Sequence, residues 1–533
     1  MKKRAGSPFY RGMIDLSSLT MTDTQSTTID LINELEWRGL LKDCTDKDGL
    51  RDHLRTGTRK IYAGFDPTAD SLTIGNLVPI MLLAHVKRAG HTPVVVMGGG
   101  TGLIGDPSGK SAERQMMTEE MVQHNVDSQH PIYDAVLGPI AGPEHELKNN
   151  NDWLSKISYI EALRDIGKHF SVNMMMQKES VKDRLNNREQ GISYTEFSYM
   201  ILQAYDFAHL YEHEGVTAQL GGSDQYGNIV VGLDLLKKHA DQLQYLRGEE
   251  FKVEIDKLDD KEEADKWKRN FVPQIRLFGN EPSDAPNSDE ISELLNSETM
   301  NFSTSFLDAM ALSIRATEKH GESRSTFGLV APLVSKADGG KFGKTETGAI
   351  WLTANRTSPY AYYQFWLNAS DDDAANWIKV FTFMPQGEVE SLIAAHSENP
   401  GKRELQRRLA QEATTILHGR EKMLVAEAAG KALFTGDINT LDNDTFLAVF
   451  LSVPTTEHAK AELADGVDMV GLLKEIGLAS SNREAREFLN EGSVSINGQK
   501  ITLDTKLTVD HLLHESYIAI RRGKKKWHLT KWN

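Results

Sequence analysis

The sequence predicts an α/β protein built on a parallel sheet, because short apolar strands alternate with turns and helical patterns. Residues 61–63 end a buried strand, a turn follows, and apolar residues recur at helical spacing from about Thr73. Residues 92–97 are a continuous β-branched run of the kind that buried parallel strands show. Residues 217–220 and 329–334 are two further strand patterns. Open α/β sheets bind ligands at the carboxyl ends of such strands.

Composition sets the broad class. The chain has 533 residues, which at roughly 150 residues per domain indicates three or four domains. Its 39% hydrophobic and 26% charged residues are typical of a soluble globular protein. A single cysteine, Cys44, excludes an internal disulfide framework and a cysteine-only zinc site, and it fits a reducing cytosol. No apolar run approaches ~18 residues, so we expect no membrane span and a cytoplasmic location.

The N-terminal segment is not expected to join the fold. Residues 1–27 carry Lys2, Lys3 and Arg4 without an apolar stretch behind them, which excludes a secretory signal. An organelle transit segment stays open. We predict a disordered N-terminal extension over residues 1–27.

The first strand–turn–helix is a candidate phosphate site. A helix N-terminus aims backbone N–H groups and a positive dipole end at one point, which suits a phosphate. Small hydroxyl and amide side chains lie in the turn, namely Thr68, Ser71, Thr73 and Asn76. An ordinary strand-to-helix loop with a capping serine is the alternative.

A glycine-rich loop follows the second strand. Gly100, Gly102 and Gly105 formally match a dinucleotide fingerprint, but the chain continues as a loop where that fingerprint requires a helix. The segment is also one residue short of a P-loop. We interpret it as a mobile loop whose Lys110 and Arg114 can swing onto an anion.

Two more segments carry candidate polar groups. Residues 141–191 are predicted to be a helical, polar-rich excursion, and residues 196–212 one helix. That helix carries Tyr199, Gln203 and Asp206 on one face; a solvated stripe is the alternative.

Residues 221–225 form another loop at a strand end, and residues 240–325 break the pattern as an insertion. The loop at 335–348 carries Lys341 and Lys344, which in many proteins would simply be solvated.

The C-terminal part differs in charge from the rest. From residue 468 to the end, eleven Lys and Arg face eight Asp and Glu, a net charge of +3 in a chain of net −16. Ser481 and Glu484 form a capping box before a basic helix, and a basic run surrounds Trp527. This pattern indicates a local contact with a polyanion such as RNA, and a merely solubilising tail is the alternative. The basic residues are Arg483, Arg486, Arg521, Arg522, Lys524, Lys525 and Lys526.

Five segments in this order resemble the bacterial-type tyrosyl-tRNA synthetases, which are class I aminoacyl-tRNA synthetases. They are YAGFDPTADSL, GGGTGLIGDPSGKSAER, FSYMILQAYDF, LGGSDQYGNI and KFGKT. The resemblance implies a Rossmann-like catalytic domain at residues 28–355, interrupted by the insertion at about 240–325. It further implies an α-helical anticodon-region domain at residues 356–465 and a small α+β unit, similar to an S4 RNA-binding domain, at residues 466–533.

The resemblance implies that ATP is a substrate, accompanied by Mg²⁺ held by its phosphates rather than by a dedicated protein site. Catalytic groups would stabilise the charge that moves onto the leaving pyrophosphate. The residues matching that role are Thr68, Thr73, Asn76, Lys110, Arg114, Lys341, Lys344 and Thr345. The residues matching ATP-binding positions are Asp66, Gly75, Gly222, Asp224, Gln225 and Lys344.

Amino-acid recognition is implied to lie beside this site. Tyr62 and Asp206 resemble the pair that reads the substrate phenol, while Tyr199, Gln203 and Asp106 resemble the groups that bind the ammonium. The implied partners are L-tyrosine, tRNA-Tyr and a second copy of the chain, which would contact the first near residues 141–190.

One departure from the family pattern bears on activity. Thr73 stands where the signature usually has a histidine, and losing a transition-state donor typically costs ~10²–10³ in rate. Three rivals stay open: a tryptophanyl-tRNA synthetase, an RNA-binding protein that has lost catalysis, and a nicotinamide-dependent enzyme.

Overall fold

The computed structural model describes residues 29–105, 117–178, 181–182, 185, 192–238, 325–345, 348–435, 437–450, 453–523 and 526–533. The N-terminal extension and residues 240–324 of the insertion lie outside these ranges. So do five predicted site residues, namely Asp106, Lys110, Arg114, Lys524 and Lys525. For Lys344 and Thr345 the description covers the backbone.

A six-stranded sheet forms the first part of the molecule, in the order β1-β6-β5-β2-β3-β4. All its neighbours run parallel except the short β1, which pairs antiparallel with β6. The parallel sheet is as predicted. The strands are β1 (Asp43–Cys44), β2 (Lys60–Phe65), β3 (Thr92–Met97), β4 (Glu146–Asn149), β5 (Val216–Gly222) and β6 (Phe327–Ala331).

Helices cover both faces of this sheet. Along β2, Ile61 and Ala63 belong to a core shared with the first helices, whereas Tyr62 between them belongs to a second core on the opposite face. This alternation is the two-residue period of a strand. The first core takes in α1 (Leu31–Arg38), α2 (Lys47–Arg55), α3 (Leu77–Arg88) and α4 (Glu119–Leu137). The second takes in α5 (Asn151–Leu154), α9 (Tyr194–His209) and the helical residues 226–238.

The prediction for residues 141–191 was incomplete. These residues include β4, which pairs parallel with β3 and forms the edge of the sheet. Its four residues are half-buried, and all but Leu147 are polar, so the strand lacks the apolar run that marked the other strands. The helical prediction holds for the segments after it, which are α5, α6 (Tyr159–Glu161), η4 (Ala162–Ile166), η5 (Gly167–His169) and α7 (Val172–Met176).

The ends of two other predicted elements differ from the prediction by a few residues. The helix expected at residues 196–212 is α9 followed by one π turn, η6 (Leu210–Glu214). The strand expected at residues 329–334 begins and ends earlier, as β6. The short 3-10 turns beside the sheet are η2 (Ile74–Asn76), η3 (Thr101–Leu103) and η7 (Ser223–Gln225).

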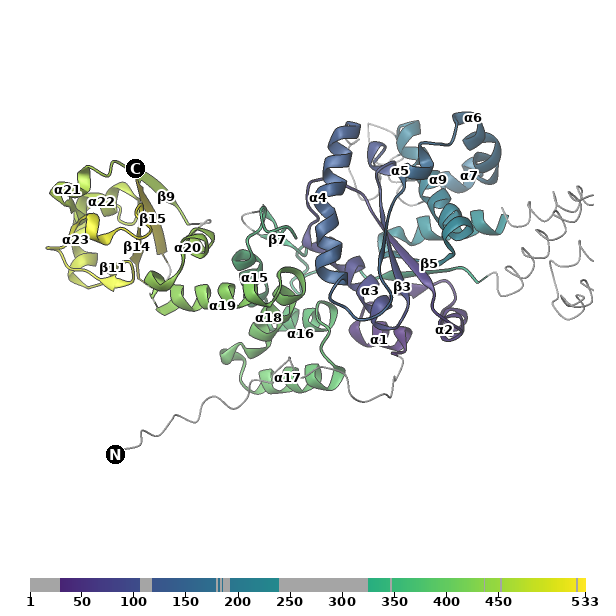
Figure 1. Cartoon of the computed structure of the whole chain (residues 1–533). Coiled ribbons are helices and arrows are strands. Elements are labelled where there is room, and N and C mark those ends of the chain that lie inside the picture. Colours follow the sequence, from purple (N-terminus) through teal and green to yellow (C-terminus); the bar gives the residue numbers. More distant parts are fainter. Residues whose placement is uncertain are drawn as a thin grey trace, which may run out of the picture.

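A bundle of helices lies between the sheet and the C-terminal unit (Figure 1). Its first helices share one continuous core with the sheet, so the two parts are packed together. A two-stranded ribbon of β7 (Lys344–Thr345) and β8 (Gly348–Ala349) precedes it. The helices are α15 (Pro359–Leu367), α16 (Asp371–Val380), α17 (Gln386–Glu398), α18 (Glu404–His418), α19 (Arg420–Thr435) and α20 (Asn443–Phe450), with short turns η8 (Pro400–Lys402) and η9 (Ile438–Thr440).

The C-terminal unit is a five-stranded sheet with helices, in the order β12-β11-β14-β15-β9. Its strands are β9 (Thr455–His458), β11 (Val494–Ile496), β12 (Gln499–Lys500), β14 (Tyr517–Arg522) and β15 (Lys526–Trp532). The remaining elements are α21 (Glu462–Asp465), α22 (Met469–Glu475), α23 (Asn482–Asn490), η10 (Val509–His511) and the β10 (Val467–Asp468) and β13 (Lys506–Leu507) pair. Because β9 pairs with β15, we propose that this unit begins before residue 466. None of the described helices is long and apolar enough to cross a membrane.

Candidate active site

The candidate site lies where the strand order reverses. β3 and β4 extend the sheet on one side of β2, whereas β5 and β6 extend it on the other. The carboxyl ends of β2 and β5 therefore flank a switch point, which is where open α/β sheets bind ligands. Asp66 directly follows β2, and Asp224 lies in the turn after β5.

Tyr62 and Asp206 come from different elements and are both buried. Tyr62 lies on β2 and is 2% exposed, while Asp206 lies on α9 and is 5% exposed. Among the residues that the structure describes, the Tyr62 hydroxyl has no hydrogen-bond partner. Burial, and next the negative charge of Asp206, raise the pKa of Tyr62. A buried hydroxyl without a partner next to a carboxylate is an unfilled polar site, because buried polar groups are normally hydrogen-bonded.

Two residues that the sequence reasoning missed hold Asp206. The Asn150 amide Nδ2 donates to Asp206 Oδ2 at 2.9 Å, and the Trp153 indole Nε1 donates to Oδ1 at 2.8 Å. Both residues follow the unpredicted strand β4. The Asn149-Asn150-Asn151 run, which begins at the last residue of that strand, was the signal that could have identified the loop.

The charge state of Asp206 reflects opposing effects. Burial raises the pKa of this carboxyl to about 7. The hydrogen bonds from Asn150 and Trp153 lower the pKa because they stabilise the ionised form, and the charge of Asp66 raises it. Asp206 can therefore be ionised near neutral pH and accept a further hydrogen bond.

Asp66 is the centre of a second group of contacts. The Tyr199 hydroxyl donates to its Oδ2 at 2.8 Å, and the Thr101 hydroxyl donates to its Oδ1 at 3.0 Å. Thr101 also accepts from Asn150 at 3.0 Å, so one hydrogen-bonded chain joins the ends of β2, β3 and β4 to α9. A Cβ on Gly98 would come within 2.4 Å of Asp66 Oδ1, which explains a glycine at this point. Thr101 was not among the predicted residues.

The amides near β5 form a third group. Gln203 on α9 donates from Nε2 to Oε1 of Gln225 at 3.2 Å. Asn228 donates to Gln203 Oε1 at 2.9 Å, so a residue absent from the prediction orients the amide of Gln203. A Cβ on Gly222 would meet Asp224 Oδ1 at 2.5 Å. Tyr199, Gln203 and Asp206 thus all take part in the site.

The signature turn has its own internal contact. The Thr73 hydroxyl donates to Asn76 Oδ1 at 3.0 Å, and the Thr73 backbone N–H donates to the same oxygen at 3.2 Å. Asn76 Oδ1 is thereby held by Thr73, and its amide nitrogen is not used in this pair. Thr68 and Gly75 are exposed nearby, in the same strand-to-helix connection.

The lysine loop packs directly against this turn. The Ile74 N–H donates to Ile350 O at 2.9 Å, and the Ile350 N–H donates to Gly343 O at 3.0 Å. Thr73 forms an isolated bridge with Trp351. Lys341 is exposed beside Gly343. Thr73 and the loop of Lys341 therefore lie together, as the sequence interpretation requires; the backbone of Lys344 and Thr345 continues this loop as β7.

The predicted RNA-binding residues fall into two kinds. Arg483 and Arg486 on α23, and Lys526 on β15, are exposed. Arg521 and Arg522 on β14 instead make contacts within the fold. The Arg521 guanidinium lies 5.0 Å from the centre of the Trp527 ring, and Arg522 donates to Leu478 O at 2.8 Å.

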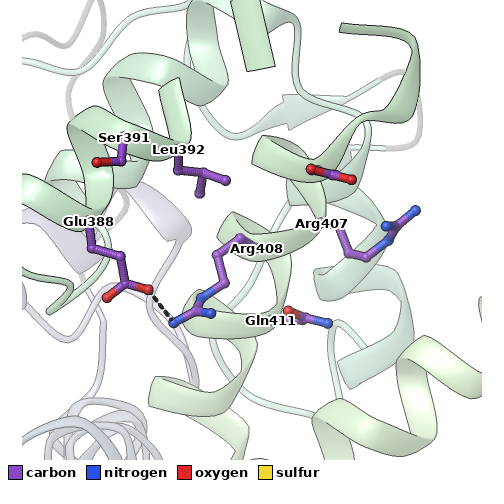
Figure 2. A pocket seen from close by; sticks show the side chains of 7 residues that line it. Glu388, Ser391, Leu392, Arg407, Arg408 and Gln411 are labelled. Atoms are coloured by element: carbon purple, nitrogen blue, oxygen red, sulfur yellow. Dashed lines mark hydrogen bonds and ion pairs between the residues drawn. The ribbon is translucent and has the colours of Figure 1, made fainter. Parts of the chain in front are cut away.

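A hollow of about 480 Å³ lies elsewhere, between α17 and α18 (Figure 2). Arg408 at its edge is neutralised by Glu388 at 3.0 Å and Glu412 at 2.8 Å. The hollow belongs to the helical bundle and contains none of the strand-end residues. We therefore do not assign the reaction to it.

The fold is that of a class I tRNA synthetase. Residues 55–253 and 310–435 match the family described as tRNA synthetases class I (W and Y), and residues 446–530 match the tyrosine–tRNA ligase SYY-like C-terminal domain. The C-terminally truncated mitochondrial tyrosyl-tRNA synthetase of Aspergillus nidulans aligns with a TM-score of 0.55 and 26% identity, covering 76% of this chain and 94% of that one.

Similar curated proteins identify the family more specifically. Tyrosine–tRNA ligase of Bacillus caldotenax is 39% identical over 95% of this chain and 100% of its own length. That of Flavobacterium johnsoniae is 37% identical over 94% and 99%. The chain belongs to the tyrosine–tRNA ligase family.

Proposed function

We propose that this protein is a tyrosine–tRNA ligase that joins L-tyrosine to ATP, releases pyrophosphate, and transfers the tyrosyl group to the 3′ end of tRNA-Tyr. The observation that carries this proposal is the buried pair of Asp206, an ionisable carboxylate, and Tyr62, whose hydroxyl has no partner. The substrate phenol can donate to Asp206 and accept from Tyr62, which satisfies both groups.

This pair accounts for the choice of amino acid. A site that offers hydrogen bonds to a hydroxyl rejects the analogue without it, because its own buried polar groups would stay unpaired; tyrosyl-tRNA synthetases are the standard example of this effect. An indole has its N–H in a different place and offers no hydroxyl. Tyr199 and Gln203, together with Asp106, would hold the ammonium group.

Activation requires orientation and charge stabilisation. A tyrosine carboxylate oxygen attacks the α-phosphorus of ATP, the bond to the bridging oxygen breaks, and pyrophosphate carries the charge away. Thr68, Thr73, Asn76, Lys110, Arg114, Lys341, Lys344 and Thr345 are the proposed donors to the phosphates. Asp66, Gly75, Gly222, Asp224 and Gln225 are the proposed contacts to the rest of ATP. We assign Mg²⁺ to the phosphates of ATP, where it would neutralise charge, because Mg²⁺ in such sites is usually held by substrate phosphates.

The partners are assigned on surface properties. Large apolar side chains are exposed on the segments after β4 and at the start of α9, among them Tyr159 (65%), Ile160 (68%), Val172 (58%) and Tyr194 (62%). An exposed apolar patch of this kind suits a second copy of the chain, so we propose a homodimer. The exposed basic residues of the C-terminal unit would contact the phosphates of tRNA-Tyr. We further propose that the enzyme acts in the cytoplasm.

Exchange of labelled pyrophosphate into ATP tests the proposal. The wild type should support exchange with tyrosine and not with tryptophan or phenylalanine, and Lys341→Ala should reduce the rate. Exchange with tryptophan instead would favour the related synthetase. If the wild type is inactive and Thr73→His restores exchange, this chain has lost catalysis through its signature turn.

A further inference from the structure

The loop that carries Lys341 has a single large apolar side chain. Between residues 335 and 349 the sequence is SKADGGKFGKTETGA, in which Phe342 stands alone among small, polar and charged residues. Phe342 is half-buried, whereas its neighbour Lys341 is exposed. Because Phe342 is the one large apolar residue of this loop, it is the one position at which hydrophobic burial can fix the loop to the rest of the protein.

Phe342 inserts into an aromatic cluster on the helical bundle. Its ring lies 5.0 Å from Trp377 in an edge-on arrangement, and 5.2 Å from Phe381 in a stacked one, measured between ring centres. Phe365 on α15 lies 5.8 Å away, also edge-on. These are the distances and orientations at which aromatic pairs attract one another beyond simple burial.

The aromatic side chains of the cluster also pack against one another. Trp366 and Phe381 lie 4.9 Å apart, and Phe365 stacks on Trp377 at 5.7 Å. Trp366, Trp377 and Phe381 are each 3% exposed or less. The bundle therefore supplies most of an apolar seat through its own side chains, and Phe342 is the group that enters it from the loop.

The next residue ties the same loop to the signature turn. Gly343 has φ +76°, and a Cβ there would lie 2.3 Å from Ile74 Cγ2. The backbone hydrogen bonds from Ile350 to Gly343 and from Ile74 to Ile350 continue this contact. Phe342 and Gly343 thus connect the helical bundle to the turn that holds Thr73 and Asn76.

We propose that Phe342 is a positioning residue for adenylate formation: its ring, seated among Phe365, Trp377 and Phe381, holds the lysine loop at the signature turn. The proposal rests on the proposed function. The inference goes beyond the proposed function because Phe342 is not among the proposed contacts to ATP or tyrosine and would act through the placement of Lys341. Displacing a reacting group by about 1 Å can lower the rate of a reaction ~10²-fold. If the loss of the Phe342 ring shifts Lys341 by such a distance, the fall in the rate of adenylate formation is large enough to measure.

Steady-state pyrophosphate exchange with the full-length protein tests this. Phe342→Ala should lower kcat by about 10–100-fold and raise KM for ATP, because the loop acts on the phosphates. KM for tyrosine should not change, because the phenol site is on α9 and β2. Phe342→Leu keeps an apolar group for the seat and should restore most of kcat.

Phe383 provides the matched control. It is also half-buried, and it packs the bundle against the sheet through Arg88, whose guanidinium lies 5.2 Å from its ring centre. Phe383→Ala removes an aromatic ring of equal size without touching the loop. Assayed well below the unfolding temperature of both variants, it should leave kcat and both KM values near those of the wild type.

The results separate this inference from the function on which it rests. If the wild type exchanges pyrophosphate normally and Phe342→Ala matches Phe383→Ala in kcat and in KM for ATP, Phe342 is only a packing residue and the inference is wrong. If KM for tyrosine rises with KM for ATP, the substitution has disturbed the whole site and the inference is again wrong. An inactive wild type would contradict the proposed function itself.

Discussion

The indole N–H of Trp153 donates a hydrogen bond of 2.8 Å to Oδ1 of Asp206, although the two residues are 53 positions apart. Asn150 holds the other oxygen of the same carboxylate. A buried carboxylate is costly without such donors, so these two residues determine both the orientation and the charge of Asp206. Recognition of the substrate phenol is therefore expected to depend on residues that do not touch it.

Trp153→Phe tests this dependence. The substitution keeps an aromatic ring but removes the donor, which should raise the pKa of Asp206 further and weaken its use as an acceptor. A hydrogen bond to a charged group contributes about 1.5–3 kcal/mol, so KM for tyrosine should rise about tenfold or more while KM for ATP changes little. Trp37→Phe, on α1, is the control and should change neither. An unchanged KM for tyrosine in Trp153→Phe would show that Asn150 alone suffices.

The pKa of Asp206 predicts how stability varies with pH. Burial raises this pKa from 3.8 to about 7, so between these values the folded protein binds more protons than the unfolded chain. The stabilising contribution is complete below pH ~4 and is lost as the pH rises to about 7. Each pKa unit corresponds to about 1.4 kcal/mol, which makes the total a few kcal/mol.

The measurement is the unfolding midpoint of the wild type relative to Asp206→Asn from pH 4 to pH 8, without substrate. The wild type should lose stability relative to the variant across this range, because the amide cannot ionise. A constant difference between the two proteins would mean that Asp206 does not titrate in this window.

Comparing alanine substitutions at Gly343 and Gly339 distinguishes the effect of backbone strain from the effect of contact with the signature turn. Both have positive φ values, +76° and +81°, in the same loop. Alanine costs about 1–2 kcal/mol in such a conformation at either position. A Cβ at Gly343 would also overlap Ile74, whereas one at Gly339 would meet nothing within 4 Å.

The kcat of Gly343→Ala for pyrophosphate exchange should therefore be at least tenfold lower than that of Gly339→Ala. The reason is that the added methyl group forces the loop away from Thr73 and Asn76. Equal rates for the two variants would show that the close approach of Gly343 to Ile74 has no role in the reaction.

Arg38 joins α1 to the helical bundle. It is 1% exposed and donates to three backbone carbonyl oxygens, those of Lys379, Thr382 and Met384, at 2.7–2.8 Å. Arg38→Ala removes the donor to these three buried carbonyl oxygens, while Glu34 keeps its contact with Arg88 at 3.1 Å. Because each buried acceptor left without a donor is costly, the free energy of unfolding should fall by about 3–5 kcal/mol.

Arg51 is the control for Arg38. It is partly exposed and pairs with Asp30 and Asp48 at 3.6 and 3.4 Å. Arg51→Ala should cost at most about 1 kcal/mol, and the comparison is made by denaturant unfolding. A small effect of Arg38→Ala would show that the contact between α1 and residues 379–384 contributes little to the stability of the fold.

Sequence reasoning found the strands that are apolar and the loops that follow them. It identified β2, β3 and β5, placed Tyr62 and Asp66 at the end of β2, and placed Tyr199, Gln203 and Asp206 on one face of a helix. Each of these patterns is local and marked by periodicity or turn residues. It missed β4, whose residues are polar except for Leu147, and with it Asn150 and Trp153. Thr101 and Asn228 were missed because each contributes only by hydrogen-bonding to a side chain from another part of the chain, which the fold brings within reach.

The order of strands, turns and helices, the basic C-terminal unit and the family motifs were determined by the sequence alone, because hydrophobic period, turn chemistry and charge are properties of neighbouring residues. Only the tertiary structure decided which distant groups meet: Trp153 with Asp206, Tyr199 with Asp66, and Phe342 with its aromatic seat. Such contacts depend on how the elements pack against one another, and no local pattern specifies that packing.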